Sequence, residues 1–362
     1  MNWTDKLIDP LATALADSGP WIRVEEARNG GWLCLSGNPG DPAVNWHHLV
    51  QDGTLTHLLP MEDKRLPAMA TACSRWISDG FSLQLLAWRV GSRSIFRLSR
   101  KNQFCYAKIF RRNRLTTERW KHLSEGSPGG LWQVPAILDW NEEDKILIIE
   151  ERVGLNLNQQ WTSGIWLDQH LEALRQVLHW LATAEILDLL PIHTVEEEIR
   201  ILNTRLEVFH RTLKEPHSNV TGLVEKVQAR LNSIGDQKLV LCHRDLHDKQ
   251  IITSWEGGSL IDLDLLAQGS SALDSGNIIA HCKLRSEQGN PVPWESIAKI
   301  LSRDASDRGV ESEALVTWTA STLARIALIY ARRKRHQGLI TKLLSSLDDL
   351  LENRGEWQGV IG

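Results

Sequence analysis

The chain has 362 residues, of which 42% are apolar, so it is long enough for more than one structural unit and can bury a substantial core. Its 41 basic residues nearly balance its 45 acidic residues, which excludes a global charge suited to nucleic acid or an anionic membrane surface. The opening residues lack a signal-peptide pattern, and no run of about 18 apolar residues follows, so we expect a soluble chain with no membrane partner.

The cysteines exclude two further classes of protein. There are five of them, an odd number, scattered along the chain and never spaced as CxxC. This pattern disfavours a disulfide framework and a zinc site. A reducing, cytoplasmic location fits best.

Residues 1–80 contain many Gly and Pro residues, as in RNGGWLCLSGNPGDPAVNW. This punctuation predicts short strands and turns between a helix near Leu7–Ala16 and another near Leu66–Ile77. We interpret the segment as an N-terminal extension or an elaborated edge of the lobe that follows.

Strand signals dominate residues 81–152. Four segments are rich in apolar and β-branched residues, FSLQLLAWRV, SIFRLSR, QFCYAKIFR and KILIIEERV. Between the third and the fourth, RLTTERWKHLSEG begins with Thr capping candidates and ends in Gly, which predicts a helix. We interpret residues 81–152 as a small sheet-rich lobe.

From residue 153 onward the apolar residues mostly take helical spacing. Residues 165–190 and 194–213 repeat apolar positions every three or four residues, and the chain returns to helical spacing from about Ala272. Between them, residues 239–269 contain short strands. The predicted fold class is therefore α+β, with a small N-terminal lobe and a larger helical C-terminal lobe over residues 153–362.

Two short basic runs, RRNR at 111–114 and RRKRH at 332–336, have no interleaved aromatic residues. We interpret them as solvated faces of helices or turns rather than a nucleic-acid patch.

The segment LVLCHRDLHDKQIITSWEGGSLIDLDLLAQG carries the strongest chemical signal. Asp245 follows an apolar strand, Gln250 comes five positions later, and Asp262 follows a second strand. Phosphoryl transfer needs a carboxylate that accepts or orients the proton of an attacking hydroxyl, and oxygen ligands for a divalent metal. Asp245 is the candidate base, and Gln250 and Asp262 are the candidate metal ligands.

Lys108 lies in the middle of the apolar strand QFCYAKIFR. An ammonium group there needs an anionic partner, and nucleotide phosphates would serve. Glu118, in the predicted helix that follows, could steady it. Taken alone, each of these residues has a more frequent structural explanation: turn or cap residues for the aspartates, a surface-reaching side chain for Lys108 and a first-turn helix acid for Glu118. Their joint occurrence, in this order and on these elements, favours the chemical interpretation.

Together these segments resemble the aminoglycoside phosphotransferase and choline kinase branch of the protein-kinase-like fold, over roughly residues 85–284. The motifs that carry the resemblance are HRDLHDKQ, IDLDLLAQG and SALDSGNIIAH. The resemblance implies that Asp245 is the catalytic aspartate, that Gln250 and Asp262 bind metal, and that Lys108 binds phosphate.

The same resemblance implies a hinge at ILIIEERVG, where backbone groups of Glu150 and Arg152 would bond adenine. Asp274, in ALDSGN, would be a structural residue of the helical lobe. Three features depart from the pattern of protein kinases. Gln250 stands where Asn is usual, a Gly-rich loop is missing with only Gly91 and Ser92 available to approach phosphates, and no A-P-E sequence follows Asp262.

The resulting hypothesis is a small-molecule kinase that uses ATP and Mg²⁺ and transfers the γ-phosphoryl group to a hydroxyl of an amino alcohol, an aminoglycoside or a sugar. Acidic residues near the cleft would favour a cationic acceptor, with Glu196–Glu198 and Asp248 as candidates, although such residues are more often solvated. The alternative is a nucleotide-binding pseudokinase that acts as an interaction module. A third interpretation is a kinase that acts on protein or on lipopolysaccharide sugars.

Overall fold

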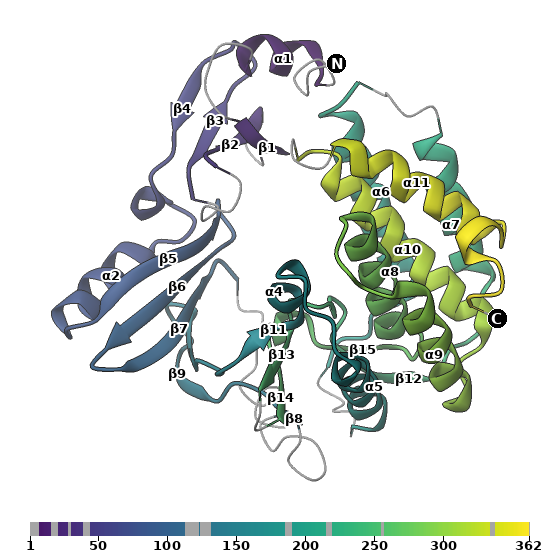
Figure 1. Ribbon diagram of the computed structural model, residues 1–362. Coiled ribbons are helices and arrows are strands. Elements are labelled where there is room, and N and C mark those ends of the chain that lie inside the picture. The colour runs from purple at the N-terminus through teal and green to yellow at the C-terminus, as the bar shows by residue number, and fades with distance from the viewer. Residues whose placement is uncertain are drawn as a thin grey trace.

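The structure of the chain is a computed structural model, and it describes residues 7–15, 21–27, 30–38, 44–112, 123, 132–184, 190–214, 219–254, 257–333 and 337–361. Sheets dominate the first part of the chain and helices the second, so the fold is α+β as predicted (Figure 1). No helix in these ranges is both long enough and apolar enough to cross a lipid bilayer.

The N-terminal unit is a four-stranded antiparallel sheet that follows the short helix α1 (Asp9–Leu15). Its strands lie in chain order: β1 (Trp21–Glu26), β2 (Trp32–Ser36), β3 (Trp46–Leu49) and β4 (Leu55–His57). The predicted strands between two helices are therefore confirmed.

The two faces of this small sheet belong to different cores. In β2, Trp32 and Cys34 join the core that extends through the helical lobe, whereas the alternate residues Leu33 and Leu35 pack into the core of the adjacent lobe. Such alternation follows from the two-residue period of a strand. The N-terminal unit therefore lies between the two lobes, as its upper position in Figure 1 shows.

The N-terminal lobe is built on a five-stranded antiparallel sheet of order β5-β6-β7-β10-β9. Its elements are α2 (Ala68–Ser78), β5 (Ser82–Arg89), β6 (Arg93–Arg100), β7 (Gln103–Phe110), β9 (Ile137–Asn141) and β10 (Ile146–Glu150). The four predicted strands and the helix near Leu66–Ile77 are confirmed, with Trp76 of α2 packed edge-on against Phe96 of β6. The helix predicted at 114–126 lies outside the described residues, apart from Leu123, which is helical.

Helices make up most of the C-terminal lobe. They are α4 (Leu157–Thr162), α5 (Asp168–Thr183), α6 (Val195–His210), α7 (Val220–Ser233), α8 (Leu273–Glu287), α9 (Trp294–Asp307), α10 (Ser312–Tyr330) and α11 (Gln337–Leu351). Helix α10 is apolar on most of its surface and is buried among α6, α7, α8 and α11. At Gly276 in α8 an added Cβ would lie 2.8 Å from the Thr319 backbone nitrogen of α10, so glycine permits this close approach.

Two small sheets of the C-terminal lobe carry the predicted chemical loops. One pairs β12 (Leu239–Cys242) with β15 (Ala267–Ser270), and the other has the order β11-β13-β14-β8. Its strands are β8 (Trp132–Gln133), β11 (Leu155–Asn156), β13 (Ile251–Ser254) and β14 (Gly257–Leu260). Residues 243–250 connect β12 to β13, and residues 261–266 connect β14 to β15, so both loops run between the same two sheets.

Candidate active site

Asp274 and Asn277, near the start of α8, hold the loop that carries Asp245. The Asp274 carboxylate accepts hydrogen bonds from the backbone N–H groups of His243 (2.7 Å) and Arg244 (3.0 Å), and Asn277 donates to the Arg244 carbonyl (3.0 Å). Arg244 has a φ of 71°, a left-handed conformation that costs about 1–2 kcal/mol in a non-glycine residue. These bonds offset that strain and leave the Asp245 side chain exposed.

Burial dominates the electrostatics of Asp274. Burial raises the pKa of this carboxyl group, while His243 and the two backbone N–H groups oppose the rise. These contacts are consistent with the structural role in the helical lobe that the ALDSGN motif implied for Asp274.

Asp262 lies in the loop after β14, also in a left-handed conformation with φ of 61°. Its carboxylate accepts a 2.7 Å hydrogen bond from Lys108 Nζ, although the two residues are 154 positions apart. His243 Nε2 lies 2.9 Å from the neighbouring Ile261 carbonyl, which ties this loop to the loop of Asp245. The two predicted loops are thus in direct contact.

Lys108 belongs to a group of four charges. It is 5% exposed and bonds both Asp262 and Asp264, the latter at 2.8 Å, while Arg93 Nη1 donates to Asp264 at 2.9 Å. Burial tends to raise the pKa of Asp262, but Lys108 and Arg93 outweigh it and hold that pKa well below its usual range. Burial also tends to lower the pKa of Lys108, and the two carboxylates outweigh it, so that pKa is raised.

Sequence reasoning assigned no role to Asp264 or Arg93. The repeated aspartate in IDLD is a local signal for Asp264, whereas Arg93 reaches the site only through the pairing of β6 with β7. Glu118, the predicted partner of Lys108, lies outside the described residues.

Gln250 is 8% exposed and connects the two loops through its backbone. Its N–H donates to the His247 carbonyl, and its carbonyl accepts from Ile261, each at 2.9 Å. Its side-chain Nε2 lies 3.3 Å from His247 Nε2. This contact occupies the amide nitrogen, and within the described ranges no residue bonds the amide oxygen.

A cavity of about 600 Å³ lies between the two lobes. Its walls include apolar side chains of both lobes together with five of the predicted site residues: Lys108, Glu150, Arg152, Gln250 and Asp262. Asp245 is not part of its lining. Mostly apolar walls with a few convergent polar groups are typical of a small-molecule site.

The predicted hinge borders this cavity. The Glu150 N–H donates to the Ala136 carbonyl at 3.0 Å, so that group is not available to a nucleotide. The Arg152 side chain bonds Glu150 Oε1 at 2.6 Å and Ser259 Oγ at 2.9 Å, which joins the hinge to β14.

The expectation that Gly91 is available to approach phosphates is wrong for its backbone N–H. Gly91 takes a φ of 62° in the turn between β5 and β6, and its N–H donates to Asp63 Oδ2 at 2.7 Å. The same oxygen accepts from Trp88 Nε1 at 2.9 Å. Asp63 precedes α2, so a residue outside the motif holds this turn.

Two expectations of solvent exposure are also wrong. Arg332, in the run RRKRH, is 4% exposed because β1 packs against it, and the Val24 N–H donates to its carbonyl at 3.2 Å. Glu198 and Asp248 are each 1% exposed rather than solvated. Each of these acids pairs with a buried or half-buried arginine, Glu198 with Arg325 at 3.0 Å and Asp248 with Arg285 at 2.8 Å.

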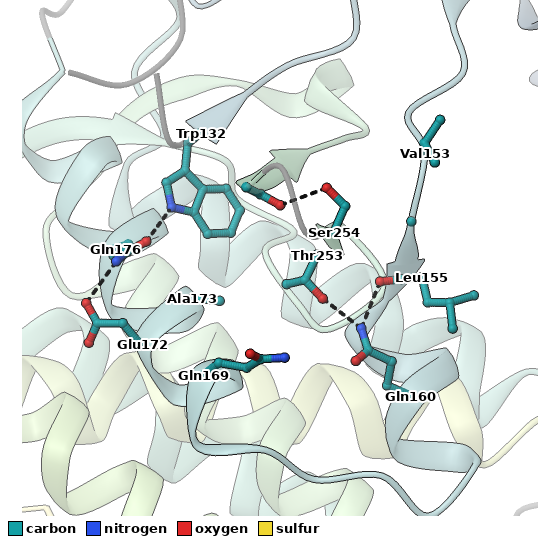
Figure 2. A pocket seen from close by; sticks show the side chains of 13 residues that line it. Trp132, Val153, Leu155, Gln160, Gln169, Glu172, Ala173, Gln176, Thr253 and Ser254 are labelled. Carbon is teal, nitrogen blue, oxygen red and sulfur yellow. Dashed lines mark hydrogen bonds between the residues drawn. The ribbon is translucent and has the colours of Figure 1, made fainter. Parts of the chain in front are cut away.

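A second cavity, of about 660 Å³, lies behind the hinge against α5 (Figure 2). Hydrogen bonds fix its polar side chains: Trp132 Nε1 donates to Gln176, Gln176 donates to Glu172, and Gln160 donates to Thr253. None of the predicted site residues lines it. Five of the predicted site residues line the cavity between the lobes instead.

No protein-family model and no curated protein matches the chain. Solved structures do match, and they share a protein-kinase-like fold. The choline kinase LicA from Streptococcus pneumoniae has a TM-score of 0.54 and 18% identity, and the match covers 79% of this chain and 99% of LicA.

Two further matches have the same character. The aminoglycoside phosphotransferase APH(4)-Ia, solved with AMP-PNP and hygromycin B, has a TM-score of 0.52 and 12% identity over 78% of this chain and 98% of its own. A choline/ethanolamine kinase family protein from Mesorhizobium loti has a TM-score of 0.52 and 12% identity, over 77% of this chain and 91% of its own. The resemblance seen in the motifs is thereby confirmed at the level of the fold, and these structural neighbours are small-molecule kinases.

Proposed function

We propose that the chain is a phosphotransferase that moves the γ-phosphoryl group of ATP, with Mg²⁺, to a hydroxyl of a small molecule. The observation that supports this most strongly is that Lys108 lines one cavity between two kinase-like lobes together with Gln250 and Asp262, which lie far from it in sequence. In this proposal residues 81–152 bind the nucleotide and residues 153–362 supply the catalytic loop and the acceptor site.

The donor set fits Mg²⁺, because the Asp262 carboxylate and the Gln250 amide oxygen are hard oxygen ligands that line the same cavity. Mg²⁺ bound there would neutralise negative charge on the phosphate oxygens. Lys108 would then exchange part of its contact with Asp262 for nucleotide phosphates, while Asp264 continues to hold its ammonium group.

Asp245 would accept or orient the proton of the acceptor hydroxyl. Its exposed carboxylate on a rigidly bonded loop suits that role. We still propose that backbone groups of Glu150 and Arg152 contact adenine. At Glu150 the contacting group would be the carbonyl, because its N–H is already bonded to Ala136. The names of the structural neighbours suggest amino alcohols and aminoglycosides as acceptor classes, and sugars remain a third class in our proposal. All five cysteines are free thiols, which supports a cytoplasmic location.

The test is Asp245→Asn. We expect it to remove nearly all phosphoryl transfer, because the amide cannot accept the hydroxyl proton, and to leave Mg-ATP binding unchanged. Asp236→Asn, an exposed residue just before β12, is the matched control and should retain full activity. Equal transfer rates in wild type and Asp245→Asn would contradict the assignment.

A nucleotide-binding pseudokinase is the second candidate. It is favoured by the ion pair of Lys108 with Asp262, because the carboxylate proposed to bind metal already has a cationic partner. A thermal-shift titration separates the two candidates. Stabilisation by ATP that requires magnesium and is lost in Asp262→Ala supports the enzyme. Stabilisation indifferent to magnesium supports the pseudokinase.

A further inference from the structure

Five arginines from distant parts of the chain form a cluster beside the loop of Asp245. We call Arg23, Arg89, Arg205, Arg332 and Arg333 the arginine cluster. They come from β1, from the end of β5, from α6 and from the segment after α10, and a β-bridge joins Arg23 to Arg333. Burial lowers the pKa of Arg332, and its neighbours Arg205, Arg333 and Arg89 lower it further. Arginine stays protonated at neutral pH, and this lowering reflects burial first and repulsion from the neighbouring guanidinium groups second.

Three members of the cluster lack a partner. Arg23 pairs with Glu25, and the Arg333 guanidinium lies 4.7 Å from the centre of the Tyr330 ring. By contrast, the side chains of Arg89, Arg205 and Arg332 form no hydrogen bond or ion pair with any residue that the structure describes. Arg332 is 4% exposed, and its buried Nε has no hydrogen-bond partner.

Two of the acids near the cluster, Glu26 and Glu198, are already engaged. Glu26 attracts Arg332 but forms its ion pair with Arg211, at 2.8 Å. Glu198, which would have favoured a cationic acceptor, is neutralised by Arg325. A buried cation without a partner raises the free energy of the folded state, and a bound anion would lower that free energy.

The cluster is also continuous with the proposed active site. Arg244, the neighbour of Asp245 in the loop, lies 3.7 Å from Glu197 of α6, the helix that also carries Arg205. Burial lowers the pKa of Arg205, and the Asp245 carboxylate opposes that lowering. At the other end, Arg93, which bonds Asp264 in the cavity between the lobes, lowers the pKa of Arg89. The elements that carry the cluster therefore border the loop of Asp245 and, because Arg89 pairs with Arg93 across β5 and β6, the charged group of Lys108.

We propose that the acceptor is an anionic hydroxyl compound, carrying a phosphate, sulfate or carboxylate group, and that Arg89, Arg205 and Arg332 bind that group. This inference rests on the proposed phosphotransfer at Asp245. It replaces the expectation of a cationic acceptor, because Glu198 and Asp248, the acids expected to attract a cation, are paired with arginines. Guanidinium groups suit this task, since their planar donors match the oxygens of phosphate and carboxylate.

The test uses inorganic phosphate as the probe, with saturating Mg-ADP present to fill the nucleotide site. Wild type, Arg205→Gln, Arg89→Gln and the control Arg200→Gln are compared by calorimetry. Arg200 lies on the same helix as Arg205, and its side chain is 67% exposed. We expect phosphate to bind wild type and Arg200→Gln equally, and each cluster variant to bind it about tenfold more weakly. Arg205 is half-buried and Arg89 is exposed, so these variants should fold even if Arg332→Gln does not.

Equal phosphate affinity in all four proteins would overturn the inference. Loss of Mg-ADP affinity in the cluster variants would also overturn it, because the arginines would then serve the nucleotide. Transfer assays with matched neutral and phosphorylated or carboxylated alcohols provide the second arm, and preference for the neutral member would count against an anionic acceptor. If wild type binds no nucleotide but still binds phosphate through these arginines, the proposed phosphotransfer fails and the anion site stands.

Discussion

Lys108 shows how a single strand residue joins two lobes. Its ammonium group is buried, and both of its partners, Asp262 and Asp264, come from one loop of the other lobe. Arg93 adds a second cation, so the group has two positive and two negative charges. Because the charges balance, these side chains can be buried, whereas a lone charge buried at this position would be strongly destabilising. It also keeps Asp264 as a permanent partner when a ligand competes for Lys108.

Glu198 gives a prediction for the dependence of stability on pH. Burial tends to raise its pKa, but Arg325, His193 and Ser321 outweigh it and lower the pKa from 4.5 to about 2. A lowered folded-state pKa stabilises the fold above the unfolded value and loses that stability as the pH falls toward 2. Glu198→Gln should therefore reduce the free energy of unfolding by about 3 kcal/mol at pH 7.

Urea denaturation at pH 7 and at pH 3 measures this effect. The difference between wild type and Glu198→Gln should shrink at pH 3, whereas the exposed control Glu295→Gln should match wild type at both values. A difference that stays constant with pH would show that Glu198 is not ionised in the folded state.

At the scale of elements, α8 serves both the core and the catalytic loop. Its first turn carries Asp274 and Asn277, which hold the loop backbone, and its Gly276 lies between them against α10. The position of the loop therefore depends on how closely α8 and α10 approach each other.

Gly276→Ala tests this packing. The added Cβ would lie 2.8 Å from the Thr319 nitrogen and 2.9 Å from the Trp318 carbonyl carbon, and these backbone atoms cannot turn aside. We expect a loss of about 1–3 kcal/mol in the free energy of unfolding and reduced transfer activity. In Gly338→Ala, on α11, the Cβ would meet nothing within 4 Å, so this variant should be neutral or slightly more stable. Equal stability of the two variants would contradict the packing argument.

At the scale of the whole molecule, the N-terminal unit connects the two lobes. Trp46 of β3 is 2% exposed and donates to the Trp88 carbonyl of the N-terminal lobe at 2.9 Å. On the other side, Ile8 donates to the Thr212 carbonyl of the C-terminal lobe at 3.2 Å.

We expect Trp46→Ala to lower the free energy of unfolding by about 3–5 kcal/mol, because it empties a buried volume and leaves the Trp88 carbonyl unpaired. Glu26→Gln, which removes a surface ion pair with Arg211 and weakens the attraction of Glu26 for Arg332, should change it by less than about 1 kcal/mol. Hydrogen exchange should show loss of protection in β3 and β5 of Trp46→Ala. Unchanged protection there would mean that the unit docks independently of Trp46.

Local patterns predicted the elements well, because strand and helix periods are properties of short segments. The strand of Lys108 and the two aspartate loops were predicted in this way, and the structure brings Lys108 and Asp262 into direct contact. The burial of Arg332 could not be predicted from its run of basic residues, since a strand about 300 positions earlier covers it. Two partners of Glu198, Ser321 and Arg325, likewise come from another helix, and no spacing rule connects them to it.

The two connections between the lobes restrict their relative motion. The chain crosses at the hinge near Glu150–Gly154, and the N-terminal unit joins the lobes at a well-separated position (Figure 1). A body attached to another at two separated points can turn freely only about the line through those points. When the ion pairs of Lys108 with Asp262 and Asp264 open, the motion left to the lobes should therefore be a rotation about this line.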